Sequence, residues 1–409
     1  MNNKAARPHI LFVSTEMHMG GVTTALLALL RTIDTSKYDV DLLLYDHSGV
    51  LQAEIPPEVR LLPAASAHRI GSKYSRLLSP AFVKGRIEAL RLEKLQGRLL
   101  EGMQLRSRLG AQFTQPCPGQ YDLAISFIEF WPLYYTATKV NARHKLAWIH
   151  IDYKSSGLSV QRDACAFPNY DRIVTVSQEC VQHLRELCPA FADRAIYMPN
   201  LVSEALIRSR ADAVPSVKLS GEPGRRLVTV ARLQLAHKGL DRGVRAFDRL
   251  RRRGLLQGAT WSIIGSGADE EALRALILEL GRENEIFLLG QQLNPLPIVA
   301  QADAFLITSH YEGKPIAVTE AQILGLPVLA TNYASAAEQI TDGVDGLIVE
   351  NSEEGIERGL ERLMETPRLL ETLKHGVQAR HYGNESEIEK YYALFEEIGV
   401  KSEETKGGR

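Results

Sequence analysis

Short, wholly apolar runs alternate with longer segments of helical spacing along most of the chain. Runs that are apolar at consecutive positions are typical of parallel strands buried on both faces. The intervening segments are long enough for crossover helices; residues 22–33, for example, carry four leucines. The predicted strands are residues 9–15, 40–45, 122–127, 145–150, 173–177, 195–200, 227–231, 260–265, 286–290, 304–308, 326–330 and 346–349.

This alternation occurs twice, which predicts an α/β protein with two doubly wound, Rossmann-like domains facing each other across a cleft. A chain of 409 residues is too long for one ordinary domain and suits two. Residues 211–226 are rich in proline and glycine and fit the connection between them. We expect domains at residues 1–205 and 206–380, followed by residues 381–409, which hold an amphipathic helix and a polar tail.

The composition is that of a globular protein, with 45% hydrophobic and 24% charged residues. A net charge of −1 argues against a general attraction to nucleic acid. Residues 1–8 are polar and no run of about 18 apolar residues occurs, so we expect neither a signal peptide nor a transmembrane helix. Four cysteines without paired spacing indicate reduced thiols in a cytoplasmic protein, namely Cys117, Cys165, Cys180 and Cys188.

The strongest candidate for chemistry is the stretch from residue 304 to 331. Its opening strand is followed by a polar turn with Glu312 and Gly313, and then by a helix that begins near Pro315. A helix N-terminus at the carboxyl end of a parallel strand is where α/β folds bind anions. Two carboxylates there, Glu312 and Glu320, would repel a phosphate unless they face hydroxyl groups, so the pattern favours a nucleotide-sugar site. The spacing alone also fits a solvent-facing turn and a helix-surface acid.

Other positions suit a phosphate or sugar ligand. Arg232 directly follows a predicted strand and Lys238 precedes a helix, and two fixed cations there suit a pyrophosphate. Gly267 lies in a turn of the kind that leaves room for a base. Gly20 and Gly21 lie between the first strand and its helix, where glycine lets a backbone approach a ligand. Each glycine position also fits an ordinary turn without a ligand.

Several of these motifs resemble glycosyltransferase family 4, a retaining family with the GT-B fold. One is Glu312 followed by Glu320-Ala, with Gly325-x-Pro-Val behind it. Another is an arginine and then Lys238-Gly, here with a gap one residue longer than usual. The glycine pair before the first helix is similar too, as is His150, which on its own is a lone histidine at a strand end. The resemblance extends over most of the chain.

The resemblance implies roles for these residues. The N-terminal domain would bind the acceptor and the C-terminal domain the nucleotide sugar, with the last helix crossing back to the first domain. Arg232 and Lys238 would stabilise the leaving diphosphate, helped by the helix N-terminus. Glu320 would hold the ribose, Glu312 the sugar hydroxyls, and His150 the donor sugar or phosphate. The implied donor site also includes Gly313, Lys314, Pro315, Ile316, Gly267, Gly20 and Gly21.

The implied activity is retaining transfer of a sugar, with a UDP-sugar favoured as donor, to a glycan or polyprenyl-linked acceptor. The segments Glu-Gly-Lys-Pro and Ala-Thr-Asn-Tyr resemble bacterial capsule and exopolysaccharide enzymes, which suggests a role in surface polysaccharide synthesis. We expect no cofactor besides the donor and no metal, because the two cations already meet the charge of the leaving group. No residue stands out as an enzyme nucleophile.

Other functions fit the same fold. A nucleotide-sugar epimerase is one, and a phosphorylase is another, although no lysine is singled out for pyridoxal phosphate. A GT-B pseudoenzyme acting as a binding subunit is a third. Its mark would be the loss of one of four residues that are all present: Glu312, Glu320, Arg232 and Lys238.

Residues 68–110 differ from the rest of the chain in charge. They hold ten Lys and Arg against three acids, an excess of seven positive charges in a protein whose total is −1. Apolar residues interleave at roughly helical spacing. A basic amphipathic helix is typical of contact with an anionic membrane surface, here the inner face, and a solvated insertion on the N-terminal domain fits equally well. The basic residues are Arg69, Lys73, Arg76, Lys84, Arg86, Arg91, Lys94, Arg98, Arg106 and Arg108.

Overall fold

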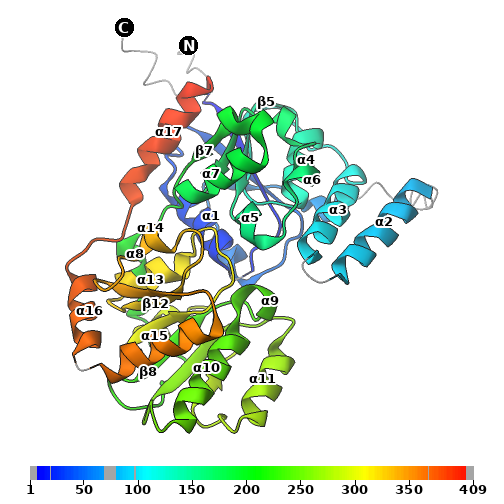
Figure 1. Ribbon diagram of the computed structural model, residues 1–409. Helices are drawn as coiled ribbons and strands as arrows, with labels where there is room; N and C mark the ends of the chain where they lie inside the picture. The colour runs from blue at the N-terminus through cyan, green and yellow to red at the C-terminus, as the bar shows by residue number, and fades with distance from the viewer. Residues whose placement is uncertain (1–6, 19, 69–79, 96–97, 367, 402–409) are drawn as a thin grey trace. The chain divides into compact units, whose positions relative to one another are not determined.

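The chain divides into two compact units, and the first is built from both ends of the sequence. Unit 1 contains Met1–Leu201 and Ser386–Arg409, and unit 2 contains Val202–Glu385. Each unit has its own sheet (Figure 1), and buried apolar residues pack on the sheets of both units. The computed structural model describes residues 7–18, 20–68, 80–95, 98–366 and 368–401.

Unit 1 is a parallel α/β sheet with helices. Within the described residues its seven strands have the order β3-β2-β1-β4-β5-β6-β7. The strands are β1 (His9–Ser14), β2 (Asp39–Leu44), β3 (Arg60–Leu61), β4 (Tyr121–Ser126), β5 (Ala142–Ile149), β6 (Arg172–Thr175) and β7 (Ala195–Tyr197). The α-helices are α1 (Gly21–Thr32), α2 (Pro80–Glu93), α3 (Leu99–Gln112), α4 (Trp131–Lys139), α5 (Tyr153–Ser156), α6 (Val160–Asp163), α7 (Gln178–Leu187) and α17 (Ile388–Glu397). Short 3₁₀ turns cover Val50–Glu54, Ala65–His68, Phe167–Asn169 and Pro189–Arg194.

Unit 2 has the same kind of architecture. Its six strands within the described residues have the order β10-β9-β8-β11-β12-β13. They are β8 (Arg226–Val230), β9 (Thr260–Ile264), β10 (Ile286–Leu288), β11 (Ala304–Ile307), β12 (Val328–Thr331) and β13 (Gly346–Val349). The α-helices are α8 (Glu204–Ala211), α9 (Leu235–Lys238), α10 (Leu240–Arg252), α11 (Glu270–Glu279), α12 (Leu296–Val299), α13 (Ile316–Ile323), α14 (Ala336–Gln339), α15 (Glu353–Glu365) and α16 (Leu369–Gln378).

The strands are apolar at consecutive positions because both faces of each sheet are buried. In β8, Leu227 belongs to one buried cluster and its neighbour Val228 to another. In β11, Leu306 belongs to the cluster of Leu227, and its neighbour Phe305 belongs to the cluster of Val228. Successive side chains of a strand point to opposite faces, so two separate cores cover the unit 2 sheet.

In both sheets, the order in which strands are added changes direction once. In unit 1 the chain runs from β1 outward to β2 and β3, and then returns to β4 on the other side of β1. In unit 2 it runs from β8 to β9 and β10, and returns to β11 on the other side of β8. Open α/β sheets bind ligands outside the carboxyl ends of the strands at such a point. The segments after β1, β4, β8 and β11 are therefore the natural places for site residues.

Helix α17 completes the core of unit 1 from the far end of the sequence. Tyr391 is 1% exposed, and its ring stacks on that of Trp148 in β5, with 5.5 Å between the ring centroids. Its hydroxyl donates to the Pro199 carbonyl oxygen at 2.6 Å. Tyr392 stacks on Tyr38, with 5.6 Å between centroids. The packing of these rings makes α17 part of unit 1.

The fold class predicted from the sequence, two doubly wound parallel sheets, is confirmed. The twelve predicted runs correspond to strands, with ends that differ by up to three residues. Strand β3 was not predicted, because two residues at a sheet edge carry no apolar run. The amphipathic helix predicted within residues 381–409 corresponds to α17, which a 3₁₀ turn (Glu385–Glu387) precedes.

The predicted basic segment forms α2 and α3 in its described part. Three of its basic residues lie outside the described residues, namely Arg69, Lys73 and Arg76. The same holds for residues 1–6 of the polar start and residues 402–409 of the polar tail. Across the part of the chain that the structure describes, no helix is both long and apolar enough to cross a bilayer.

Candidate functional site

The segments that follow β8 and β11 in unit 2 are bonded to each other. The Thr308 hydroxyl donates to the Lys238 carbonyl oxygen at 2.8 Å, and the His310 amide donates to the His237 carbonyl oxygen at 2.8 Å. Gly239 has φ 56°, and a Cβ there would lie 2.5 Å from the Thr308 oxygen. A glycine after Lys238 is therefore required for the two segments to approach.

Glu312 is the most strongly held carboxylate of this site. It is 7% exposed, and its Oε1 accepts hydrogen bonds from Lys238 Nζ and Ser309 Oγ, both at 2.6 Å. Burial alone would raise the pKa of Glu312, but the positive charge of Lys238 and the neighbouring His237 outweigh it and hold the pKa well below its usual value. Glu312 is therefore an ionised acceptor in a fixed position. The structure thus brings together two predicted site residues, Glu312 and Lys238.

His237 is a residue of this site that was not predicted, and it lies directly before Lys238 in the gap that is one residue longer than usual. Its ring lies parallel to that of Tyr311, with 4.3 Å between centroids. Its Nε2 is buried and lies 3.6 Å from Glu312 Oε2, too far for a hydrogen bond. The signal in the sequence was a ring next to a predicted phosphate-binding lysine, but its contact with Tyr311 depends on how two distant segments fold.

Arg232 lies two residues after the end of β8, and its side chain is exposed. Among the residues described by the structure, its guanidinium has no ion-pair partner, so it is available to an anion. The neighbouring Leu233 amide donates to the Ser266 carbonyl oxygen at 3.0 Å. A Cβ at Gly267 would lie 2.2 Å from the Leu233 oxygen. Gly267 thus lets the segments after β8 and β9 pack together, and its predicted role beside a base stays a prediction.

The start of α13 completes the segment after β11. Pro315 occupies the position before Ile316, the first helical residue, so the Ile316 and Ala317 amides lack intrahelical acceptors. The Val318 amide donates to the Pro315 carbonyl oxygen at 3.2 Å. Gln339 Nε2 donates to the Pro315 carbonyl oxygen at 3.1 Å and fixes this end. Gly313 is buried, while Lys314 Nζ lies 3.6 Å from Glu338 Oε2. The helix start can therefore receive an anion, with one more cation on its approach.

Glu320 lies on the second turn of α13 and differs from Glu312 in its partners. Burial raises its pKa to about 7, and the positive charge of Arg210 offsets part of this effect. Within the described residues, no protein group donates a hydrogen bond to its carboxylate. The side chain is partly exposed. The structure does not bring Glu320 into contact with Glu312 or Lys238. Its oxygens are open to donors from a ligand.

In unit 1, the predicted glycine pair begins α1. Gly21 is the first helical residue, Gly20 precedes it, and both are exposed. A Cβ at either position would meet nothing within 4 Å. Neither glycine is needed for packing here, so the backbone after β1 is open to approach.

His150 directly follows β5 and is 7% exposed. Its Nε2 lies 2.9 Å from the Phe127 carbonyl oxygen, which can only accept, so Nε2 carries the proton of this bond. Burial lowers the pKa of His150 to about 4, which keeps the ring neutral at pH 7. Its Nδ1 is then a hydrogen-bond acceptor. An acceptor fits a sugar hydroxyl better than a phosphate oxygen.

Glu129 is a buried carboxylate that sequence reasoning missed. Its Oε1 accepts hydrogen bonds from the backbone amides of His150 and Ile151, the latter at 2.7 Å, while its Oε2 is buried without a partner. Burial raises its pKa to about 7. Glu129 follows β4 closely, which places it at the carboxyl edge of the sheet, and this position was its only signal in the sequence. It fixes the backbone that carries His150.

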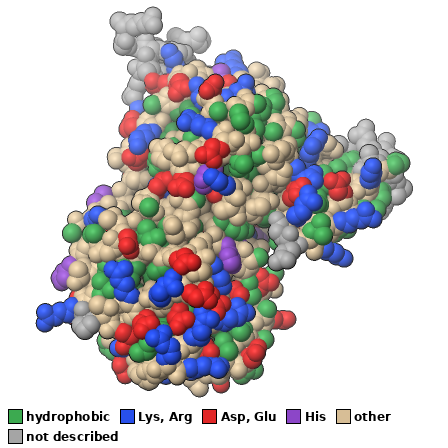
Figure 2. Space-filling view, viewed as in Figure 1, with side chains coloured by type: hydrophobic (Ala, Val, Ile, Leu, Met, Phe, Trp, Pro, Cys, Tyr) green, Lys and Arg blue, Asp and Glu red, His purple; other side chains and the backbone are tan. Residues whose placement is uncertain are grey.

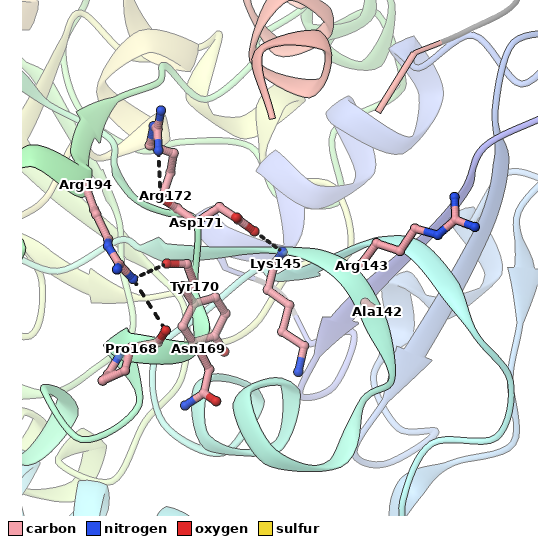
Figure 3. Close-up of a pocket in the computed structure, with 9 residues that line it drawn as sticks. All are labelled: Ala142, Arg143, Lys145, Pro168, Asn169, Tyr170, Asp171, Arg172 and Arg194. Atoms are coloured by element: carbon pink, nitrogen blue, oxygen red, sulfur yellow. Dashed lines mark hydrogen bonds between the residues drawn. The ribbon is translucent and has the colours of Figure 1, made fainter. Parts of the chain in front are cut away.

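A cavity of about 500 Å³ in unit 1 lies elsewhere (Figure 3). It surrounds Ala142 and Arg172, which begin β5 and β6, so it is at the amino ends of these strands and not at the edge that carries His150. Its cations are already engaged. Arg143 bonds Asp122 at 3.0 Å, Arg172 bonds Glu397, and Arg194 donates to the Tyr170 carbonyl oxygen at 2.9 Å.

In the described part of the chain, no group of three or more His, Cys, Asp or Glu side chains is arranged to hold a metal ion.

Comparisons with solved structures identify the architecture. A structure of Anabaena HepE in complex with UDP and glucose matches with a TM-score of 0.67 and 16% identity, covering 96% of this chain and 100% of HepE. TarM from S. aureus matches with a TM-score of 0.65 and 14% identity, covering 95% of this chain and 99% of TarM. The fold is that of GT-B glycosyltransferases.

Comparison of sequences adds a match to a family model over part of the chain. Residues 213–380, within unit 2, match the family model of glycosyl transferases group 1. An uncharacterized glycosyltransferase of Haemophilus influenzae is 23% identical over 266 residues, which cover 62% of this chain and 70% of that protein. The N-acetylgalactosamine-N,N'-diacetylbacillosaminyl-diphospho-undecaprenol 4-alpha-N-acetylgalactosaminyltransferase of Campylobacter jejuni is 31% identical over 120 residues, covering 29% of this chain and 33% of that enzyme.

Proposed function

We propose that this protein is a retaining glycosyltransferase of family 4 that moves a hexosyl group from a nucleotide sugar, with a UDP-sugar favoured, to a glycan or polyprenyl-linked acceptor. The observation that carries the proposal is the pairing of Lys238 with the ionised Glu312 beside the start of α13, at the point where the unit 2 sheet reverses. This arrangement puts a cation, a fixed acceptor and free helix amides at one place, as a sugar diphosphate requires.

Each residue has a role in donor binding. Arg232 and Lys238 meet the diphosphate, together with the amides that begin α13. Lys238 has three N–H donors and uses one on Glu312, so the others remain for phosphate oxygens. Glu312 accepts from hydroxyls of the donor sugar, and Glu320 accepts from the ribose. Gly20, Gly21 and Gly267 let the backbone approach, and Gly313, Lys314, Pro315 and Ile316 form the helix start.

The transfer step that we propose needs no enzyme nucleophile. The acceptor hydroxyl attacks the anomeric carbon on the face from which the diphosphate leaves. As the new C–O bond forms, the old bond to the phosphate oxygen breaks and its electron pair stays with the diphosphate. That oxygen takes the proton of the attacking hydroxyl, while the cations stabilise its charge. His150, through Nδ1, accepts a hydrogen bond from a donor-sugar hydroxyl. No metal and no cofactor besides the donor take part.

The name of one relative supports a proposal about the cellular setting. The name of the Campylobacter jejuni relative specifies a diphospho-undecaprenol acceptor and an alpha linkage. We therefore propose transfer in surface polysaccharide synthesis, at the cytoplasmic face of the inner membrane. The relatives named above are glycosyltransferases, so we propose transfer rather than epimerisation or phosphorolysis.

A donor screen of the purified protein tests the proposal. UDP-, GDP- and TDP-sugars are supplied without acceptor, and slow release of UDP from a UDP-sugar is the expected result, with the α-anomer of the sugar as first product by NMR. E312Q should lower the rate, whereas E371Q, a change of an exposed carboxylate on α16, should not. Activity should persist in excess EDTA. Binding of none of the donors overturns the proposal, release of the β-anomer overturns retention, and loss in EDTA that Mg²⁺ or Mn²⁺ restores overturns the metal-free mechanism.

A further inference from the structure

Helices α2 and α3 form a hairpin in unit 1, here called the α2–α3 hairpin. Helix α2 packs against α3, and α3 packs against α4 (Figure 1). The inner side of α2 is fixed by Ala89 and Leu92, which are 1% and 6% exposed. Since helix positions advance by about 100° per residue, the direction opposite to these two side chains is that of Val83, Ile87 and Leu90.

The hairpin is firmly attached, so this orientation is defined. Gln104 of α3 is fully buried and donates to Asp163 Oδ2 at 2.7 Å and to the Ser159 carbonyl oxygen at 2.9 Å. Arg162 of α6 bonds Glu101 at 2.8 Å and Glu88 at 3.3 Å. One acid from each helix of the hairpin is thus held by the same arginine, and α2 cannot rotate without breaking these contacts.

The outer face of α2 combines exposed apolar and basic side chains. Val83, Ile87 and Leu90 are 41%, 45% and 48% exposed, and their spacing aligns them in one stripe. Exposed cations surround the stripe on both sides and at its end. Figure 2 shows hydrophobic and basic side chains lying together on the surface of the hairpin. The outer face consists of Val83, Lys84, Arg86, Ile87, Leu90, Arg91 and Lys94.

The acids of the hairpin do not neutralise this face. Glu88 is bonded to Arg162, Glu93 lies 3.3 Å from Arg106, and Glu101 is shared by Arg98 and Arg162. Among the described residues, the four cations of the outer face have no ion-pair partner. Arg98, by contrast, is engaged with Glu101 at 2.7 Å and does not belong to the face.

We propose that the outer face of α2 docks on an anionic lipid bilayer. A narrow apolar stripe with cations on both sides suits a helix lying in the interface, where the apolar side chains enter the acyl boundary and the long basic ones reach the headgroups. Four cations without facing acids match the negative charge of such a surface. A protein partner would have to present acidic side chains on both sides of an apolar strip to match these cations. This inference names the membrane partner in the proposed function, but its geometry is independent of the donor chemistry.

Co-sedimentation of the full-length protein with lipid vesicles tests the proposal. At low salt the protein should sediment with vesicles containing phosphatidylglycerol, and not with vesicles of phosphatidylcholine alone. Binding to the phosphatidylglycerol vesicles should weaken as the salt concentration rises, because salt screens the attraction between the cations and the anionic lipid. The variant K84Q/R86Q/R91Q/K94Q should bind more than about tenfold more weakly. A second variant, V83S/I87S/L90S, should also bind more weakly, and because these side chains are exposed it should keep its fold.

A matched control removes four exposed cations from unit 2, in the variant R208Q/R274Q/R358Q/R362Q. It should bind vesicles like the wild type. Wild type that stays in the supernatant at low salt overturns the proposal, as does equal weakening in the control. A dimer by sedimentation velocity that V83S/I87S/L90S abolishes would show that a second copy covers the face, and would also overturn it.

Donor hydrolysis measured on the same samples separates this inference from the proposed function. The charge variant should hydrolyse the donor at the wild-type rate, because none of its residues belongs to the donor site. Vesicle binding without hydrolysis of any donor would reject the proposed function and keep the membrane contact. Hydrolysis of a donor without vesicle binding would keep the proposed function and reject the membrane contact.

Discussion

At the scale of single residues, the contact between Lys238 and Glu312 decides the charge of the proposed donor site. Both side chains are largely buried, with 17% and 8% of their surface exposed. A buried carboxylate is costly unless a cation compensates it, and Lys238 does so. The same bond fixes the acceptor oxygen in place before a ligand arrives, which lowers the cost of ordering it later.

Replacing Lys238 by Met should therefore destabilise unit 2. We expect K238M to lower the free energy of unfolding by about 3–5 kcal/mol, since it leaves a buried charge without its partner. The double variant K238M/E312Q should lose less than K238M alone. Urea unfolding followed by circular dichroism measures both. The exposed pair Arg358–Glu350 is the control, and R358M should cost less than about 1 kcal/mol. Equal losses in the single and double variants would contradict this account.

Glu320 should make donor binding depend on pH. Burial raises its pKa to about 7, so it is mostly protonated at pH 6 and mostly ionised at pH 8. The ionised carboxylate accepts ribose hydroxyls best, so the affinity for UDP should rise about tenfold over this interval. E320Q should bind UDP more weakly, by about 1.5–3 kcal/mol at pH 8, and its affinity should be flat with pH. Calorimetric titration at both pH values measures this, and an unchanged slope in E320Q would remove Glu320 from the site.

At the scale of elements, the turn after β5 depends on a carboxylate from the turn after β4. E129A leaves the His150 and Ile151 amides without an acceptor, at a cost of about 1–3 kcal/mol in stability. In E129Q the side-chain amide oxygen can still accept both bonds, so this variant should keep most of the stability and of kcat/KM. Thermal melts and donor hydrolysis compare the two. If E129Q loses as much activity as E129A with an unchanged melt, the carboxylate acts directly and not by positioning His150.

The elements also show what a sequence can and cannot predict. Strands such as β1 and β11 were predictable because burial on both faces leaves an uninterrupted apolar run. The positions of Glu312 after β11 and of Glu320 on α13 were predictable, because the strand and the helix that fix them were predictable. The partners of Glu129 and His237 were not, because these contacts join segments about twenty residues and about seventy residues apart in the chain. The break between α2 and α3 was not predicted either, since the amphipathic spacing continues across it.

At the scale of the whole molecule, unit 1 needs its last helix. Tyr391 of α17 covers Trp148, so Y391A should cost unit 1 about 3–5 kcal/mol. Y391F keeps the ring and loses only the bond to the Pro199 carbonyl oxygen, which costs about 0.5–1.5 kcal/mol. Scanning calorimetry should show the transition of unit 1 moving to lower temperature in Y391A while that of unit 2 stays in place. Equal shifts for both variants would mean that α17 contributes little beyond one hydrogen bond.

The division of unit 1 between the two ends of the sequence sets an order of events on the ribosome. Unit 2 is one continuous segment and can fold as soon as it emerges. Unit 1 begins before unit 2 but is completed after it, because Ser386–Arg409 is made after unit 2. At translation rates of about 5–20 residues per second, the nascent chain waits roughly 10–40 s between the end of the first segment and the arrival of α17. For that interval the aromatic surface around Trp148 lacks its cover, and it is a natural target for a chaperone that binds nascent chains.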